Sequence, residues 1–427
     1  MPPANLPGRR PLRVALYEPS GFGGICHYTY QLAQALSERG CEVTLITTEA
    51  YELAHLPRRF RVRYRFKRSL LKRLFGPIGW PRRFRRDGAA SGAPPIDPLS
   101  ARMRAARLRL LQVRIALELA ALRTDVVHVQ SIGGGRNLFF VRLLRFLRLP
   151  VLYTAHEALP HEGEAPQNAT SLAAVYRTAT RIIVHAESTR KEMLEKFGVS
   201  PERVDVVPHG SYDLFFPEGR ISRAAARARL GFPADRRIIL FFGLIKRYKG
   251  LEYLIEAFRR IEESLPDATL AIVGNLFRQD SVGYARYSRL LAEVSRRPNV
   301  LRVEGYVPIE KVGLYLSAAD LVVLPHTETS QSGVLLAAFA AGRPAVVTDT
   351  GGLPETVERG RAGLVVPPRD ARALAEAILR VLERPEDAEA MGQNAAREAD
   401  STYSWSPIAA RTVELYLSAI SDLNRPA

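Results

Sequence analysis

Short apolar runs alternate with helical patterns along this chain, and the alternation occurs twice. The first series comprises Leu12–Tyr17, Glu42–Thr47, Asp125–Val129, Val151–Thr154, Arg181–Val184 and Arg203–Val207. The second comprises Arg237–Phe242, Ala268–Val273, Val300–Val303, Leu321–Leu324, Ala345–Thr348 and Gly363–Val366. Strands that alternate with helices predict a parallel sheet covered on both faces. We therefore predict an α/β fold with two doubly wound units in tandem.

The length of 427 residues also favours two domains over a single core. We predict an N-terminal domain over 1–216, with an insertion at about 51–98 that breaks the alternation, and a second domain over 217–405. Residues 406–427 read as a helix, since Val413, Tyr416 and Leu417 fall on one helical face. We expect this helix to pack back on the N-terminal domain.

The composition is that of a soluble globular protein, with 47% hydrophobic and 25% charged residues. No run of about 18 apolar residues is present, so no transmembrane helix is expected. The first residues contain no apolar run typical of a signal peptide. Two cysteines, Cys26 and Cys41, are too few for a disulfide framework or a usual metal site. We expect a cytoplasmic protein.

The net charge of +17 is concentrated in one segment. Between Arg58 and Arg86 the chain has thirteen lysines and arginines and no acidic residue. Aromatic residues such as Phe60, Tyr64 and Trp80 are interleaved with them. This mixture suits an anionic membrane surface or a lipid-linked phosphate. A nucleic-acid contact or a solvated basic loop are the alternatives.

A second basic stretch, Leu138–Arg148, has a helical pattern. Arg142, Arg145 and Arg148 share one side, and apolar residues such as Phe140 and Leu144 lie opposite. Such a helix either lies in a membrane interface or is a core helix with an exposed basic stripe. Together with the first segment it favours a protein that is peripheral on the inner face of the membrane.

Two glycine-rich corners precede helical patterns in the second half. Thr329–Val334 leads into an apolar helix, and Gly351–Glu355 follows the strand Ala345–Thr348. A helix N-terminus exposes N–H groups and partial positive charge, which suits a phosphate. Each corner alone is also compatible with an ordinary strand-to-helix turn. Together they predict a nucleotide-sugar site in which Ser330, Gln331, Ser332 and Gly333 hold the phosphate or the sugar.

Seven motifs occur in the order found in a known family. They are Gly21–Gly24 with the helix after it, Thr154–Glu157, Val207–Asp213, Gly243–Gly250, Gly305–Pro308, Ala318–Asp320 and Gly351–Glu355. They resemble retaining glycosyltransferases of family 4 (glycosyl transferases group 1), within the exopolysaccharide and glycolipid type, over roughly Leu12 to Ser406. The resemblance implies the GT-B fold, with two Rossmann-like domains facing a central cleft. It also implies metal-independent sugar transfer from a nucleotide-sugar to a lipid-linked or glycan acceptor.

The resemblance assigns roles to particular residues. His156 would bind the transferring sugar near the reacting centre, and Lys249, with Lys246 or Arg247, would neutralise the donor diphosphate. The remaining donor contacts would be Gly23, Gly24, Val307 and Glu355. By contrast, His128 and His185 lie in or just after strands, and we interpret them as structural.

The chain departs from the family at two positions. Thr329 and Ala337 stand where the family commonly has glutamates, the second of which usually binds the donor ribose. A non-catalytic relative or a nucleotide-sugar epimerase of the same fold therefore remain alternatives. No cofactor, metal site, nucleic-acid recognition module or obligate protein partner is predicted. The donor is left open between UDP- and GDP-sugars.

Overall fold

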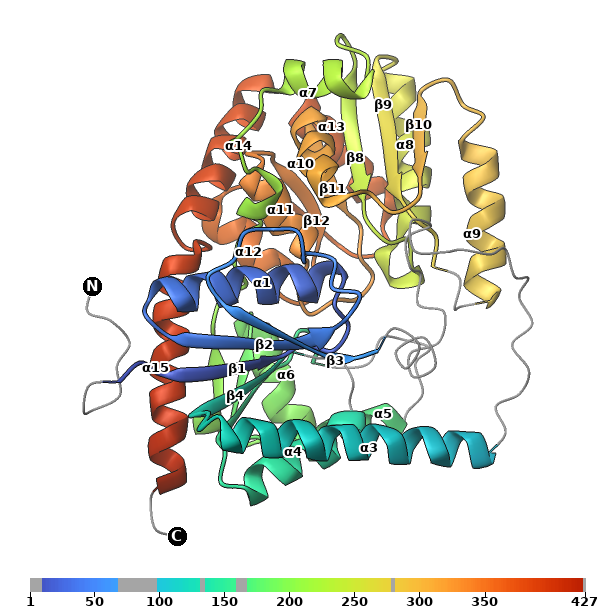
Figure 1. Cartoon of the computed structure of the whole chain (residues 1–427). Coiled ribbons are helices and arrows are strands. Elements are labelled where there is room, and N and C mark those ends of the chain that lie inside the picture. Colours follow the sequence, from blue (N-terminus) through green and yellow to red (C-terminus); the bar gives the residue numbers. More distant parts are fainter. Residues whose placement is uncertain (1–9, 68–97, 131–134, 159–166, 278–280, 425–427) are drawn as a thin grey trace. The chain divides into compact units, whose positions relative to one another are not determined.

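The computed structural model describes residues 10–67, 98–130, 135–158, 167–277 and 281–424. The described chain forms two compact units, each built around one sheet (Figure 1). Of the described residues, unit 1 holds those up to Pro208 together with those from Trp405 onward, and unit 2 holds those from His209 to Ser404. The chain thus returns to unit 1 for its last helix, α15 (Trp405–Asn424).

Unit 1 contains a seven-stranded parallel sheet in the order β3-β2-β1-β4-β5-β6-β7. Its strands are β1 (Arg13–Tyr17), β2 (Glu42–Thr48), β3 (Arg61–Phe66), β4 (Val126–Gln130), β5 (Val151–Thr154), β6 (Arg181–Val184) and β7 (Val204–Val206). The order reverses between β1 and β4. In doubly wound sheets ligands bind at the carboxyl ends of the strands beside such a reversal.

Helices cover both faces of this sheet. They are α1 (Gly23–Glu38), α3 (Pro98–Ala121), α4 (Gly135–Phe146), α5 (Gln167–Thr178), α6 (Glu187–Phe197), the short η2 (Pro201–Arg203) and α15. Helices α3 to α6 bury their apolar sides in one core with the sheet, and α1 packs against α15. Apolar strands such as Val151–Thr154, buried at every position, explain why both faces need covering.

Strand β3 corrects the interpretation of the basic segment Arg58–Arg86. Its first part is an edge strand that pairs in parallel with β2, from Thr44 opposite Arg61 onward. Arg63 and Arg65 both bind Glu118 of α3, at 2.6 and 2.7 Å. These two arginines therefore share one carboxylate within the unit, which offsets one of their two charges. The rest of the segment, from residue 68, lies outside the described residues.

Helix α4 decides between the two interpretations of Leu138–Arg148. Phe140, Val141 and Leu144 are fully buried in the core of unit 1. The opposite side, with Arg142 and Arg148, is exposed. The apolar side identified from the sequence is thus occupied by the protein's own core. Helix α4 is a core helix whose exposed side carries arginines together with Phe139 and Phe146.

Unit 2 contains a six-stranded parallel sheet in the order β10-β9-β8-β11-β12-β13. Its strands are β8 (Arg237–Phe242), β9 (Ala268–Gly274), β10 (Val300–Glu304), β11 (Leu321–Leu324), β12 (Ala345–Thr348) and β13 (Gly363–Val366). The order reverses between β8 and β11. The α/β fold predicted from the sequence is confirmed, and each strand of the second series begins where we predicted it.

The helices of unit 2 follow its strands closely. They are α7 (Arg223–Leu230), α8 (Leu251–Ser264), α9 (Ser281–Val294), α10 (Ile309–Ala318), α11 (Gly333–Ala340), α12 (Leu353–Gly360), α13 (Ala371–Leu382) and α14 (Pro385–Asp400), with 3-10 turns η3 (Asp213–Phe215) and η4 (Arg247–Lys249). Among the described residues of the chain, none of the helices has the length and apolarity needed to span a bilayer.

Candidate active site

The loop after β8 carries the three candidate donor-binding cations. Gly243 has a positive φ of 107°, and Gly250 ends the turn Arg247–Lys249 at a φ of 62°. A side chain at Gly250 would collide with the carbonyl of Pro325, just after β11. The loops after β8 and β11 therefore touch through their backbones, which fixes the cations at the carboxyl edge of the sheet.

Lys249 lies beside the first turn of α11. A Cβ atom added to Gly243 would be 3.6 Å from Lys249 Nζ and 3.6 Å from Val334 Cγ2, so both side chains border one spot. Val334 belongs to the first turn of α11, where leading N–H groups carry partial positive charge. Because Gly243 has no side chain, space is left beside the Lys249 ammonium and the N-terminus of α11. Both groups favour negative charge, so this space suits a phosphate group.

Lys246 and Arg247 take different positions in the same loop. The Lys246 ammonium lies over two aromatic rings, 4.7 Å from the centroid of Phe277 and 5.5 Å from that of Tyr248. Arg247 is exposed. Of the three cations, Lys249 is therefore the one that the structure brings to α11.

The two glycine-rich corners are in direct contact. The Gly352 N–H donates to the carbonyl of Ser330 over 2.9 Å. A side chain on Gly351, whose φ is 52°, would collide with the carbonyl of Thr329. Ser330 and Ser332 are buried. The loops after β11 and β12 thus form one continuous wall, joined through their backbones, at the edge where Lys249 lies.

A side chain on Gly333, the first residue of α11, would displace Tyr212. A Cβ atom on Gly333 would lie 2.9 Å from Cε2 of Tyr212, whose ring covers it. In the described structure, the side chain of the N-cap residue Ser332 makes no capping hydrogen bond. Gln331, half-buried, presents its carbonyl to the Thr329 hydroxyl at 2.9 Å. The N-terminus of α11 is therefore approached closely by other groups but is not capped by its own serine.

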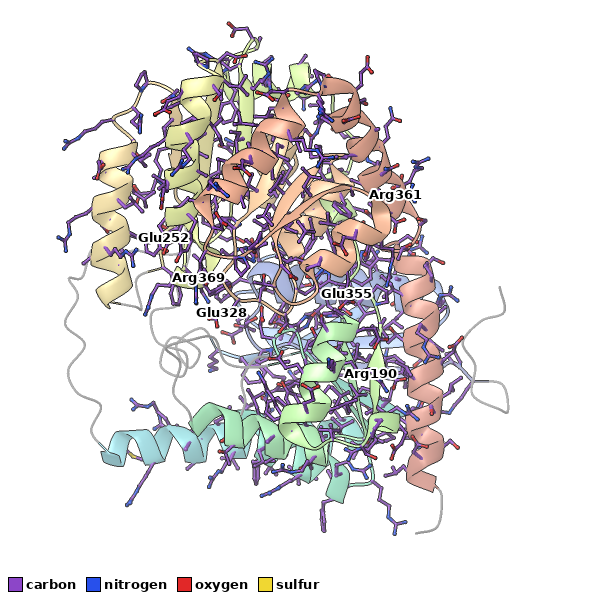
Figure 2. All side chains as sticks on the ribbon, turned by 180° about the vertical axis from the view of Figure 1, so that it is seen from behind. Arg190, Glu252, Glu328, Glu355, Arg361 and Arg369 are labelled. Atoms are coloured by element: carbon purple, nitrogen blue, oxygen red, sulfur yellow. The ribbon has the colours of Figure 1, made fainter. Side chains whose placement is uncertain are left out.

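Glu328 and Glu355 are carboxylates at this same edge. Glu328 follows β11, and Glu355 lies in the first turn of α12 (Figure 2). At the two positions where the family has glutamates, the Thr329 hydroxyl is bonded to a backbone carbonyl, and Ala337 is only 3% exposed within α11. A carboxylate contact to the donor here must therefore come from other positions.

Val307 follows β10, the outer strand of the sheet. Gly305 turns the chain there with a φ of 121°, and Val307 is half-buried. Because β9 lies between β10 and β8, Val307 is at the predicted edge but two strands away from the loop that carries Lys249.

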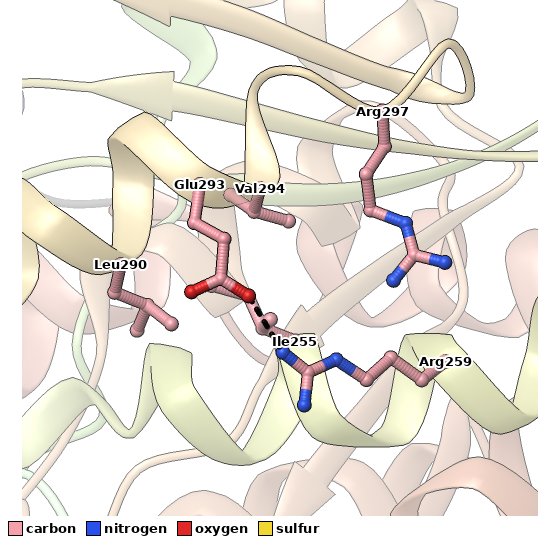
Figure 3. Close-up of a pocket in the computed structure, with 6 residues that line it drawn as sticks. All are labelled: Ile255, Arg259, Leu290, Glu293, Val294 and Arg297. Atoms are coloured by element: carbon pink, nitrogen blue, oxygen red, sulfur yellow. Dashed lines mark hydrogen bonds and ion pairs between the residues drawn. The ribbon is translucent and has the colours of Figure 1, made fainter.

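A pocket elsewhere in unit 2 is separate from this edge. It has a volume of about 250 Å³ and lies between α8 and α9 (Figure 3). Arg259 and Glu293, 3.2 Å apart, cross it. Its lining residues are Ile255, Arg259, Leu290, Glu293, Val294 and Arg297. None of the predicted site residues lines it, so we do not assign it to the donor.

The glycine-rich loop of unit 1 is held by two carboxylates that we did not single out from the sequence. Glu18 is buried, which raises its pKa, and it accepts from the N–H of Gly21 at 2.9 Å. Glu52 accepts from the N–H of Gly23 at 3.0 Å. Gly24 is exposed. The N–H of Gly23 is thus bound within the unit.

His156 lies just beyond β5 in a chain of hydrogen bonds. Its Nε2 is 2.7 Å from Oε1 of Gln130, the last residue of β4. Its Nδ1 is 3.3 Å from Nε2 of His185, which follows β6 and donates from Nδ1 to the Val207 carbonyl at 2.9 Å. The Tyr28 ring lies edge-on to His156 at 4.9 Å. Three adjacent strands therefore fix the orientation of His156.

These bonds determine which ring nitrogens carry hydrogen. Because a carbonyl only accepts and burial lowers the pKa of His185 to about 4, His185 at neutral pH has hydrogen on Nδ1 and a lone pair on Nε2. His156 Nδ1 must then donate to it. His156 Nε2 faces the Gln130 amide at 2.7 Å, and the same amide bonds to His128 at 3.0 Å. The Gln130 side chain therefore helps to fix the orientation of His156.

Helix α15 supports this cluster from the far end of the chain. The Tyr416 hydroxyl lies 2.7 Å from His128 Nδ1, and Thr154 Oγ1 lies 2.7 Å from His128 Nε2. Burial lowers the pKa of His128 to about 3, so this ring stays neutral. Trp405 packs edge-on against Tyr28 at 5.1 Å. His128 is linked to His156 through Gln130, whereas His185 bonds directly to His156.

Comparison with known proteins agrees with this geometry. Residues 222–398 match the family described as Glycosyl transferases group 1, and residues 22–211 match Glycosyltransferase Family 4. The D-inositol 3-phosphate glycosyltransferase of Thermobispora bispora is 31% identical over 317 residues, which is 71% of this chain and 72% of that protein. The enzyme of the same name from Corynebacterium glutamicum is 28% identical over 70% of this chain and 73% of its own length.

Solved structures share the fold at lower identity. HepE from Anabaena, in complex with UDP and glucose, has a TM-score of 0.73 at 17% identity and covers 95% of this chain and 100% of that one. Sucrose-phosphate synthase from Thermosynechococcus elongatus has a TM-score of 0.70 at 23% identity, with 97% and 100% covered. Both support the two-sheet architecture of the GT-B fold. The chain therefore belongs to family 4 of the glycosyltransferases and is a glycosyltransferase that uses a nucleotide-sugar.

Proposed function

We propose that this glycosyltransferase takes its sugar from a UDP-sugar and transfers it with retention of the anomeric configuration. The observation that carries the proposal is the Lys249 ammonium, which borders the same spot above Gly243 as the first turn of α11. Uridine as the base is supported by HepE, which was solved with UDP and with UDP-glucose. A GDP-sugar is the competing donor.

The charge around α11 matches what sugar transfer requires. As the bond from the anomeric carbon to the diphosphate oxygen breaks, negative charge grows on the leaving diphosphate. Lys249 and the N–H groups at Gly333 and Val334 stabilise that charge, a role that a metal ion has in other enzymes. The acceptor hydroxyl bonds to the anomeric carbon and gives its proton to the departing diphosphate. The products are the glycosylated acceptor and UDP.

The other predicted residues fill supporting roles in this proposal. His156 donates or accepts at a hydroxyl of the transferring sugar, with its orientation fixed by Gln130 and His185. Glu355 accepts from hydroxyls of the sugar or the ribose. The loop Ser330–Gly333 holds the diphosphate through backbone N–H groups, assisted by Lys246, Arg247 and Gly24, and the Val307 backbone contacts the base.

For the acceptor we propose a lipid-linked or glycan molecule at the inner face of the membrane. The exposed arginines of α4 support this proposal, since they suit an anionic lipid. The competing acceptor is a phosphorylated inositol, which is favoured by the relatives' activity and by 31% identity to one of them. Radiolabelled transfer into a lipid extract, compared with transfer to inositol phosphate, distinguishes the two. Proton NMR of the product reports the anomeric configuration.

Donor binding is tested by thermal stabilisation with UDP, GDP and ADP. We expect selective stabilisation by UDP, lost in Lys249→Ala and kept in Lys311→Ala, which removes an exposed lysine from α10 of the same unit. If no nucleotide stabilises the wild-type chain, the donor site is wrong. Conversion of the donor sugar without any acceptor would favour an epimerase, and binding without turnover on any acceptor would favour a non-catalytic relative.

A further inference from the structure

Exposed large apolar side chains gather on two helices of unit 1. Six such side chains occur among the described residues, and five of them lie on α3 and α4. They are Met103, Leu110 and Leu117 on α3, exposed by 50, 71 and 56%, and Phe139 and Phe146 on α4, exposed by 37 and 82%. We call these five residues and the arginines between them the α3–α4 surface.

The apolar residues of α3 form a stripe that points away from the core. Met103, Leu110 and Leu117 are spaced by seven residues, which is close to two helical turns, so they share one face. The opposite face carries Ile115 and Leu119, which are fully buried in the core of unit 1. The stripe is therefore not the helix's core-packing side, and folding of the unit does not require it to be apolar.

The two helices present one joined surface. Helices α3 and α4 pack against each other (Figure 1), and the Arg109 guanidinium lies 5.9 Å from the centroid of the Phe139 ring. Phe139 and Phe146 are seven residues apart, as in the α3 stripe, and Arg142 lies on the same face of α4. Apolar and basic groups thus alternate across both helices.

The surface is positively charged. From Arg102 to Ala121, α3 has five arginines and one acidic residue, Glu118, and α4 has no acidic residue. Glu118 is already bound by Arg63 and Arg65. Arg107 and Arg114 each follow an exposed apolar residue by four positions, and therefore lie on the same face of α3.

We propose that the α3–α4 surface binds the surface of an anionic phospholipid bilayer. The five apolar side chains enter the boundary between headgroups and acyl chains, and the arginines contact lipid phosphates. A second copy of the chain would place equal positive charge against this surface. Single-stranded nucleic acid binds through aromatic stacking, whereas three of the five apolar residues here are aliphatic. Charge and aliphatic character together therefore favour lipid.

This proposal does not depend on the reaction, so it is tested without an activity assay. The full chain is floated with vesicles of phosphatidylcholine alone or with about 30% phosphatidylglycerol, at about 150 mM salt. We expect binding to the anionic vesicles to be at least about tenfold stronger. Equal binding to both vesicles, or binding to neither, overturns the proposal.

Two sets of variants locate the binding. The apolar variant Leu110→Gln, Leu117→Gln, Phe146→Gln is compared with Tyr64→Gln, which alters the exposed apolar residue of β3. The basic variant Arg107→Gln, Arg114→Gln, Arg142→Gln is compared with Arg259→Gln, Arg372→Gln, Arg384→Gln, which removes the same charge from exposed positions of unit 2. At about fivefold per arginine, the basic variant should bind about a hundredfold more weakly.

The controls should bind as the wild type does. All variants are expected to keep the melting temperature of the wild type. They should also keep the stabilisation by UDP, so failure of the donor proposal can be distinguished from failure of the lipid proposal. If both surface variants still float with anionic vesicles, lipid binding belongs to another segment and the proposal is wrong. A wild-type dimer that the apolar variant separates, or salt-dependent RNA binding without vesicle binding, would equally overturn it.

Discussion

The edge around Lys249 in unit 2 and the histidine cluster of unit 1 are assembled in different ways. The first is made of backbone: glycines, loop carbonyls and helix N-termini that follow directly from three strands. The second is made of side chains from five separate elements, including Tyr28, Gln130 and Tyr416. A backbone site is encoded by local sequence, whereas a side-chain network depends on contacts between distant segments. The two sites should therefore respond differently to mutation.

The largest effect is expected at the backbone site. Lys249→Ala should lower kcat/KM about a thousandfold, or about 4 kcal/mol, because it removes the cation that stabilises the leaving diphosphate. The melting temperature should not change. Steady-state kinetics with Lys311→Ala as control measure this, and a loss below about tenfold would move the phosphate site away from Lys249.

The next largest effect concerns acid stability of the side-chain cluster. Burial lowers the pKa of His185 from 6.5 to about 4, so the unfolded chain binds more protons than the folded chain between those values. The free energy of unfolding therefore falls as pH drops from 6.5 toward 4, by about 3 kcal/mol for this group. Denaturant unfolding across that range should show the fall. His185→Gln should reduce the fall by about half, because buried His128, whose pKa is also lowered, contributes in the same direction over this range. Exposed His55→Gln should leave the fall unchanged.

Gln130→Leu tests whether the Gln130 amide positions His156 for catalysis. We expect kcat to fall about a hundredfold with KM little changed, and the pH–rate profile to shift, because the acceptor of His156 Nε2 is lost. Gln130→Glu keeps an acceptor and should restore most of kcat. A Gln130→Leu enzyme with an unaltered pH profile would mean that Gln130 only fills space.

Gly351→Ala should disturb the backbone contact between the two glycine-rich loops after β11 and β12. The added Cβ collides with the Thr329 carbonyl at a φ of 52°, at a cost of about 2 kcal/mol in stability and with weaker UDP binding. Gly219→Ala is the control, since it has a φ of 87° but no atom within 4 Å of the new Cβ. Thermal unfolding and UDP titration of both variants separate backbone strain from collision. Equal effects would argue against a fixed contact between the corners.

The smallest effect is expected for Tyr416→Phe. It removes the hydroxyl that lies 2.7 Å from His128, three hydrogen bonds away from His156. Stability should fall by about 1 kcal/mol and kcat should change less than threefold. Tyr64→Phe, on an exposed edge strand, is the control. A large loss of kcat would show that the side-chain network transmits changes along its whole length.

The strands were the most predictable part of the fold, because short apolar runs such as Leu321–Leu324 can be recognised from the local sequence alone. Strand β3 was missed because it alternates Arg with Val, Tyr and Phe. The carboxylate that binds two of its arginines belongs to Glu118, more than fifty positions away. Helix α3 was missed for a related reason. Its exposed face carries Met103, Leu110 and Leu117 among arginines, so its pattern does not identify one core-packing side.

The candidate site shows the same division. Gly243, Gly333 and Gly351 could be predicted, since loop glycines before helices are a local feature. The hydrogen bond from Gly23 to Glu52 and the contact of His185 with His156 could not. They depend on how separate strands align, although Gln130 and His185 do end or follow strands next to β5 and could be sought there.

The position of α15 has a consequence for how the protein is made. Among the described residues unit 2 is one continuous stretch, from His209 to Ser404, and a continuous unit can fold once it has left the ribosome. Unit 1 cannot be completed until Trp405 and Tyr416, synthesised after all of unit 2, have reached Tyr28 and His128. During translation unit 1 therefore stays incomplete until α15 has been synthesised, and the histidine cluster is among the last parts of the molecule to form.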